Sequence, residues 1–140
     1  MSESTSAAGM DGVFRLDLEA DGGAVVAGRE FARQALTELG WLPAADTRAQ
    51  TAADDVLLLV SELVTNACRH GKAPYHLVLR GTEAGVRVEM ADSGSELPTL
   101  APDRPTVPGG FGIRLVVRLA HAWGVTEGPT GKVVWLEVGR

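Results

Sequence analysis

The sequence predicts an α+β fold, a two-layer sandwich in which helices cover one face of a mixed, mostly antiparallel sheet. Two stretches in the first half carry apolar residues at helical spacing, which predicts the helices. Short alternating stretches come in pairs around glycine-containing turns, which predicts hairpins and hence the sheet. The chain has 140 residues, of which 45% are hydrophobic, and this suits one domain with a full core.

The first elements precede Trp41. Residues 1–10 are rich in Ser, Ala and Gly and predict a mobile tail, so the domain should comprise residues 11–140. Alternation over Val13–Leu18 predicts a short strand at an edge of the sheet. Helical spacing from Val25 to Leu39 predicts a helix that Gly40 ends.

The longest predicted helix runs from about Ala52 to His70, after a polar connector over residues 43–50, and organises the rest of the chain. We expect Thr51 to cap its N-terminus. Each residue turns a helix by about 100°, so one broad arc of this helix is apolar and should face the core. The arc comprises Val56, Leu59, Val60, Leu63, Val64 and Ala67.

Three polar side chains of this helix drift from the edge of the arc into it. Glu62, Asn66 and His70 follow one another at intervals of four residues. A polar group carried into the interior costs about 1–3 kcal/mol unless it is partnered. These residues therefore need hydrogen bonds, a metal or a ligand, unless all three line a hydrated rim of the core.

After Gly71 the apolar pattern changes to period two. Tyr75–Arg80 and Val86–Met90 flank a five-residue loop and predict an antiparallel hairpin. The remaining predicted elements are a long loop over residues 92–112, a helix over residues 113–120 and a closing hairpin of residues 124–127 and 132–138.

Composition narrows the function. A formal net charge of −5 argues against binding to a phosphate backbone, so we expect no direct nucleic-acid partner. The single cysteine, Cys68, cannot form an internal disulfide, which favours a reducing compartment. No apolar run approaches the roughly 20 residues of a membrane helix, and no signal-peptide pattern opens the chain. We therefore expect a soluble, cytoplasmic protein with no membrane partner.

Three pieces of the chain can line a pocket between the helices and the long loop. Glycines at a helix start let N–H groups approach a phosphate, although most such glycines only join a loop to a helix. An aspartate at a strand end is most often a turn former. Asn66 is more telling, because its carbonyl oxygen can ligate Mg²⁺, and Glu62 one turn away could deprotonate a nucleophile. The pieces are Glu62, Asn66 and His70 on the long helix, Asp92 and Gly94 after a strand, and Gly109, Gly110 and Gly112 before the third helix.

Three motifs resemble those of the GHKL ATPases, the superfamily that includes gyrase B and the histidine kinases. The run Glu-Leu-Val-Thr-Asn-Ala-Cys-Arg-His-Gly from Glu62 to Gly71 resembles the asparagine box. Asp92-Ser93-Gly94 resembles the first glycine box, and Gly110-Phe111-Gly112-Ile113 resembles the second. The motifs occur in the family's order, and the Trp-Gly-Val segment at Trp123 is typical of one subgroup, the small stand-alone anti-sigma-factor serine kinases.

The resemblance implies the Bergerat ATP-binding fold, with ATP and Mg²⁺ as cofactors. Asn66 would coordinate the Mg²⁺ held against the ATP phosphates, and Glu62 would be the general base that acts on the nucleophile. Arg69 and His70 lie next to these residues and would have only a supporting role.

The glycine boxes would hold the two ends of the nucleotide. Asp92 would accept a hydrogen bond from the adenine amino group, and Gly94 would allow the ring to lie close. Gly110 and Gly112 would hold the phosphates at the hinge of a lid formed by the preceding loop.

The subgroup also implies two protein partners. The nucleophile would be a serine on an anti-anti-sigma factor, and the other partner would be an RNA-polymerase sigma factor. The two partners would exclude each other, and phosphorylation would reset the switch. Relatives are often homodimers, and the strand over residues 13–18 is a candidate for pairing across such an interface.

Departures from the family pattern predict weaker ATP binding. Glu96 stands where relatives often have a second glycine, and Phe111 stands where an arginine is frequent. Many relatives place in the last strand a threonine that helps to hold adenine through water, whereas here Lys132 is followed by Val133 and Val134.

Three functions therefore compete: an anti-sigma-factor serine kinase, a regulatory module that sequesters a partner with little or no phosphoryl transfer, and the ATPase half of a histidine kinase. The third is disfavoured because no dimerisation helix with a phosphoacceptor histidine precedes the domain. Retention of Glu62 and Asn66 favours the kinase over the module without settling the choice.

Overall fold

The computed structural model describes residues 12–95 and 112–140. Its elements follow the predicted order: β1 (Val13–Leu18), α1 (Ala24–Glu38), α2 (Thr47–His70), β2 (Tyr75–Gly81), β3 (Gly85–Asp92), α3 (Gly112–Leu119), β4 (Ala122–Gly128) and β5 (Gly131–Gly139). The predicted tail and most of the predicted loop, including Glu96, Gly109, Gly110 and Phe111, lie outside the described residues.

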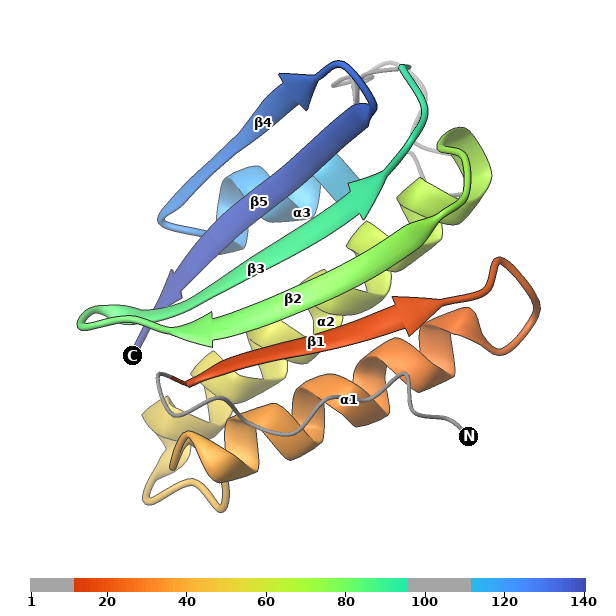
Figure 1. The fold of residues 1–140 in the computed structure, drawn as a ribbon. Helices are drawn as coiled ribbons and strands as arrows, with labels where there is room; N and C mark the ends of the chain where they lie inside the picture. The colour runs from red at the N-terminus through yellow and green to blue at the C-terminus, as the bar shows by residue number, and fades with distance from the viewer. Residues whose placement is uncertain (1–11, 96–111) are drawn as a thin grey trace.

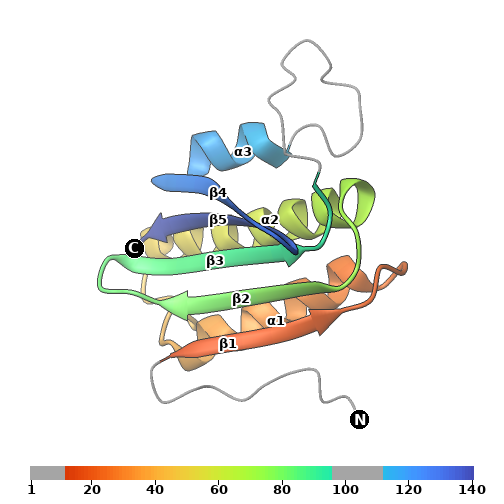
Figure 2. The same cartoon turned by 45° about the horizontal axis from the view of Figure 1, so that its top comes forward.

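The strands form one sheet in the order β1-β2-β3-β5-β4, with every neighbouring pair antiparallel. The described helices lie on one face of this sheet, and the opposite face carries no described helix (Figure 1, Figure 2). The α+β sandwich is therefore confirmed, with a sheet that is antiparallel among its described strands rather than mixed. Two helices connect β1 to β2 and return the chain so that the neighbouring strands run in opposite directions.

The core lies between the helices and the inner face of the sheet. All six residues of the predicted apolar arc of α2 are buried. Alternate residues of the central strands meet them from the sheet, including Leu77 of β2, Val88 of β3 and Leu136 of β5, each fully buried. No helix within the described ranges is long and apolar enough to cross a membrane.

Helix α2 begins earlier than the sequence predicts, and its cap is a different residue. The side chain of Asp46 accepts a hydrogen bond of 2.8 Å from the backbone N–H of Ala49 and caps the helix that starts at Thr47. Thr51 is an exposed residue inside the helix, so its prediction as the cap is wrong. Asp46 has the extended backbone of an N-cap, and its carboxylate also suits the positive end of the helix dipole.

The cap assignment predicts that Asp46→Ala lowers the free energy of unfolding by about 1 kcal/mol, because the Ala49 N–H loses its acceptor. Thr51→Ala is the matched control, and it should change the free energy of unfolding by less than about 0.5 kcal/mol. Urea unfolding followed by circular dichroism measures both values. An equal loss in the two variants would contradict the assignment.

Candidate functional site

Asp92, the last residue of β3, is the fixed point of the candidate site. It is 6% exposed, and its Oδ1 accepts three hydrogen bonds. The donors are the backbone N–H of Gly94 at 2.7 Å, the backbone N–H of Lys72 at 3.3 Å and Nζ of Lys132 at 3.0 Å. These donors come from the chain just after β3, the end of α2 and the start of β5, so one carboxylate joins three segments.

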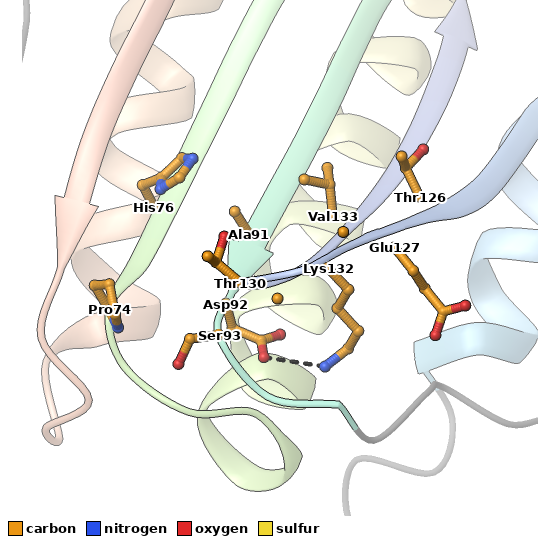
Figure 3. A pocket seen from close by; sticks show the side chains of 12 residues that line it. Pro74, His76, Ala91, Asp92, Ser93, Thr126, Glu127, Thr130, Lys132 and Val133 are labelled. Atoms are coloured by element: carbon orange, nitrogen blue, oxygen red, sulfur yellow. Dashed lines mark hydrogen bonds and ion pairs between the residues drawn. The ribbon is translucent and has the colours of Figure 1, made fainter.

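Lys132 lies opposite Asp92 in the register of β3 and β5, and the two side chains form a buried ion pair. Figure 3 shows the two charged groups turned toward each other. A buried charge costs several kcal/mol unless it is paired, so each group stabilises the other in this position. Lys132 was not among the predicted site residues. The sequence does indicate its burial, because Lys132 falls on the inward alternation that continues with Val134, Leu136 and Val138.

Two glycines bring their backbones against Asp92. A Cβ on Gly71, at the end of α2, would lie 2.5 Å from Cγ of Asp92. Gly131 has a φ of 149°, and a Cβ there would overlap the carbonyl oxygen of Asp92. Both positions therefore require glycine. The position of Gly71 in the asparagine-box motif does not by itself reveal this steric reason.

Glu62 and Asn66 lie on the flank of α2 that faces away from α1. Val60 and Val64 occupy the other flank, beside Gly28 of α1, and the 100° step turns Glu62 and Asn66 toward the side of α3. Both residues are half-buried, between the interior and the hydrated rim that the sequence leaves open. Figure 1 shows α2 between α1 and α3.

Each of the two side chains shows the effect of burial. Oδ1 of Asn66 is buried and has no hydrogen-bond partner among the described residues. Desolvation raises the pKa of the Glu62 carboxyl above its ordinary value. A buried acceptor without a partner is rare in proteins, and a bound ion or water is one explanation for it.

Arg69 and His70 are exposed at the end of α2. The expectation that His70 enters the interior is wrong, because the buried arc ends at Ala67 and the helix stops at His70 itself. The structure therefore brings Glu62 and Asn66 to a shared flank of α2, and it leaves His70 outside the core.

Glu62, Asn66 and Gly71 follow one another along the axis of α2. Asn66 precedes Gly71 by five residues, which is about 7.5 Å along a helix axis, and Glu62 lies about 6 Å further. Gly112 is the first residue of α3, which packs against α2. An N-terminus of this kind favours an anion such as a phosphate.

The side-chain oxygen of Asn66 suits a Mg²⁺ ion whose other ligands are mainly water and substrate phosphates. No cluster of three His, Cys, Asp or Glu side chains that could enclose a metal occurs within the described residues. Mg²⁺ is usually held by one or two protein oxygens together with water and substrate phosphates. The unpartnered oxygen of Asn66 fits that requirement.

A pocket of about 530 Å³ opens at the same end of the sheet. Asp92 and Lys132 lie in its wall, and His76, Ala91 and Val133 line it from the sheet face that carries no described helix (Figure 3). Glu62 and Asn66 do not line it. It is therefore a different space from the one that these two residues face.

The chain matches a known protein family over most of its length. The model of the histidine kinase-like ATPase domain matches residues 18–138, and the chain therefore belongs to this family. Membership implies that the chain binds ATP. No curated protein matches the chain.

The fold resembles that of a solved structure. The RsbU and RsbW domains of Rv1364c from Mycobacterium tuberculosis match over 91% of this chain with a TM-score of 0.64 and 21% sequence identity. This chain covers 33% of that chain, so it spans about a third of its length. The histidine kinase domain of the blue-light activated histidine kinase from Erythrobacter litoralis EL346 matches over 63% of this chain and 44% of its own, with 27% identity and a TM-score of 0.47.

The packing at Asp92 predicts that Gly71→Ala destabilises the protein by about 1–3 kcal/mol, because the new methyl group overlaps Asp92 and the carbonyl oxygen of Ala67. Gly22→Ala is the matched control, since a Cβ there meets nothing within 4 Å. Thermal and urea unfolding measure the difference. Equal stability of the two variants would contradict the close approach of α2 to Asp92.

Proposed function

We propose that the protein is a Mg²⁺-dependent serine/threonine protein kinase that transfers the γ-phosphoryl group of ATP to a serine on an anti-anti-sigma factor. In the alternate state it binds and sequesters a sigma factor. The observation that carries the kinase assignment is the buried, unpartnered Oδ1 of Asn66, one helical turn from the desolvated carboxylate of Glu62.

Asn66 supplies the protein's oxygen to Mg²⁺. The residue is the one asparagine in the chain, and its position on a long, well-packed helix fixes the oxygen before the metal binds. Bound Mg²⁺ supplies charge neutralisation at the ATP phosphates. Oxygen coordination would also remove the cost of leaving a buried acceptor unpaired.

Glu62 accepts the proton of the attacking serine. A general base works best when its pKa approaches the working pH, and burial moves the Glu62 pKa in that direction. Most of the catalytic effect in phosphoryl transfer comes from positioning, which the rigid helix provides for both Glu62 and Asn66.

The remaining residues bind and orient the nucleotide. Asp92, held by its three hydrogen bonds, accepts from the adenine amino group, and the bare backbone of Gly94 leaves room for the ring. Gly110 and Gly112 hold the phosphates at the N-terminus of α3. Arg69 and His70 lie exposed beside the site at the end of α2.

The resemblance of the motifs from Ser61 to Gly71 and at Trp123 to the anti-sigma-factor serine kinases supports the choice of partners. The presence of an RsbW domain in the Mycobacterium tuberculosis structure that shares the fold is consistent with this choice. Retention of both Glu62 and Asn66 favours phosphoryl transfer over a module that only sequesters a partner.

The metal assignment predicts that Asn66→Ala removes the Mg²⁺-dependent part of ATP affinity, a loss of roughly tenfold or more. Calorimetric titration with ATP, with and without Mg²⁺, measures this loss. The circular dichroism spectrum should stay unchanged, because Oδ1 of Asn66 makes no hydrogen bond to any residue that the structure describes.

Gln34→Ala, an exposed amide on α1, is the matched control and should bind ATP as the wild type does. Equal Mg²⁺ dependence in Asn66→Ala would remove the metal assignment. No binding by the wild type at millimolar ATP would contradict the kinase and favour the sequestering module.

The base assignment predicts two effects of Glu62→Gln. ATP should still bind while phosphorylation of the anti-anti-sigma factor, followed with γ-labelled ATP, is lost. The variant should also be more stable than the wild type at pH 7. The folded state of the wild type binds the Glu62 proton more tightly than the unfolded state does, so its stability falls as pH rises through the raised pKa.

The gain in stability should vanish at pH values below 4.5, the ordinary pKa of glutamate, where the carboxyl is neutral in both states. Glu83→Gln, in the exposed loop between β2 and β3, serves as the control and should show no such gain. Full kinase activity in Glu62→Gln would contradict the role of a base.

A further inference from the structure

Lys132 is a lysine in an unusual place. The chain contains two lysines, Lys72 and Lys132, and the first is exposed while the second is 6% exposed. Lysine is among the residues that proteins bury least. The neighbours of Lys132 on the same face of β5 are Val134, Leu136 and Val138, so packing alone would be served by another apolar side chain.

Backbone groups as well as Lys132 hold Asp92 in its orientation. Two backbone N–H groups, those of Lys72 and Gly94, already fix its Oδ1 from two sides. Lys132 adds a third bond to the same oxygen. An ammonium group has three N–H donors, and this bond uses one of them. The pair thus presents a hydrogen-bond acceptor and a hydrogen-bond donor side by side.

We propose that Lys132 is a specificity-determining residue of the nucleotide site, which donates a hydrogen bond to N1 of adenine while Asp92 accepts one from the N6 amino group. This inference rests on the proposed binding of ATP with its adenine at Asp92. The Watson–Crick edge of adenine presents a donor next to an acceptor, which complements the Asp92–Lys132 pair.

Lys132 supplies a donor that its neighbours lack. Val133 and Val134 carry no polar side-chain atom, so neither can hold a water against the base. Among the described residues, Lys132 is the one side chain that donates to Asp92. The ammonium group of Lys132 therefore donates its hydrogen bond to N1 directly, without a bridging water.

The same pair excludes guanine in this orientation. Guanine would place its O6 acceptor against the Asp92 carboxylate and its N1–H donor against the ammonium. The first contact places two hydrogen-bond acceptors together, and the second places two donors together. Buried polar groups that are left unpaired in this way discriminate strongly against the wrong ligand. Asp92 alone would select only for an amino group on the base. Asp92 together with Lys132 also selects for a hydrogen-bond acceptor at the neighbouring ring position, N1.

The contact is tested by removing the acceptor from the nucleotide and the donor from the protein. The ligands are ATP and 1-deaza-ATP, in which a C–H group replaces N1, and the proteins are the wild type, Lys132→Met and Lys132→Arg. The wild type should bind 1-deaza-ATP roughly ten- to hundredfold more weakly than ATP, the value of one charged hydrogen bond. In Lys132→Met the two ligands should bind equally, while Lys132→Arg keeps a donor and a preference for ATP.

Controls separate the contact from general damage. Arg33→Met removes an exposed cation on α1, whose partner is Glu30, and should keep the wild-type ratio. Lys132→Met leaves the Asp92 charge buried without its counter-ion, so thermal unfolding is recorded for each variant. If this variant does not fold, the wild type and Lys132→Arg still measure the dependence on N1.

The outcomes distinguish this inference from the proposed function. A wild type that binds no ATP overturns both. Equal affinity of the wild type for ATP and 1-deaza-ATP overturns the role of Lys132 alone. A ratio that persists in Lys132→Met, or tighter ATP binding by that variant, also overturns it, because another group would then contact N1 or Lys132 would compete with the base.

Discussion

The hydrogen bonds that converge on Oδ1 of Asp92 are the constraint on which the site depends. They join the segment that follows α2, the chain after β3 and the start of β5 at one atom. The glycines at positions 71 and 131 make the approach sterically possible, and the charge of Lys132 makes it electrostatically tolerable. Because the same oxygen ties the segment after α2 to the sheet, the position of the Asp92 carboxylate and the packing of the domain are set together.

One flank of helix α2 stabilises the fold, and its neighbouring flank carries polar groups that destabilise it. Its apolar arc buries six side chains and stabilises the fold. Its other flank holds the carboxylate of Glu62, which burial desolvates, and the oxygen of Asn66, which has no partner among the described residues, and both are costs to stability. Active sites commonly hold such destabilising groups, and the length of α2 supplies the packing that offsets them.

The sequence predicts what is local and misses what depends on distant partners. Periodicity was enough for the arc of α2 and the hairpin of β2 and β3, because both patterns repeat within a few residues. The cap was misplaced because Asp46 and Thr51 are both good caps, and only the observed start of the helix separates them. Lys132 was missed because its partner is 40 residues away and the pairing is fixed by the register of β3 with β5. The burial of His70 was misjudged because a helical pattern does not show where the core beneath it ends.

The place of β5 between β3 and β4 has a consequence for the nascent chain. A ribosome that has not yet released Gly131–Gly139 leaves β3 with an open edge, and Asp92 has no counter-ion. Such a chain presents an unpaired strand edge and a carboxylate without a counter-ion. Closure of the sheet and neutralisation of the Asp92 charge are the same event, since β5 supplies both the missing strand and Lys132. A chain cut short before β5 would therefore be prone to aggregate through the open edge of β3.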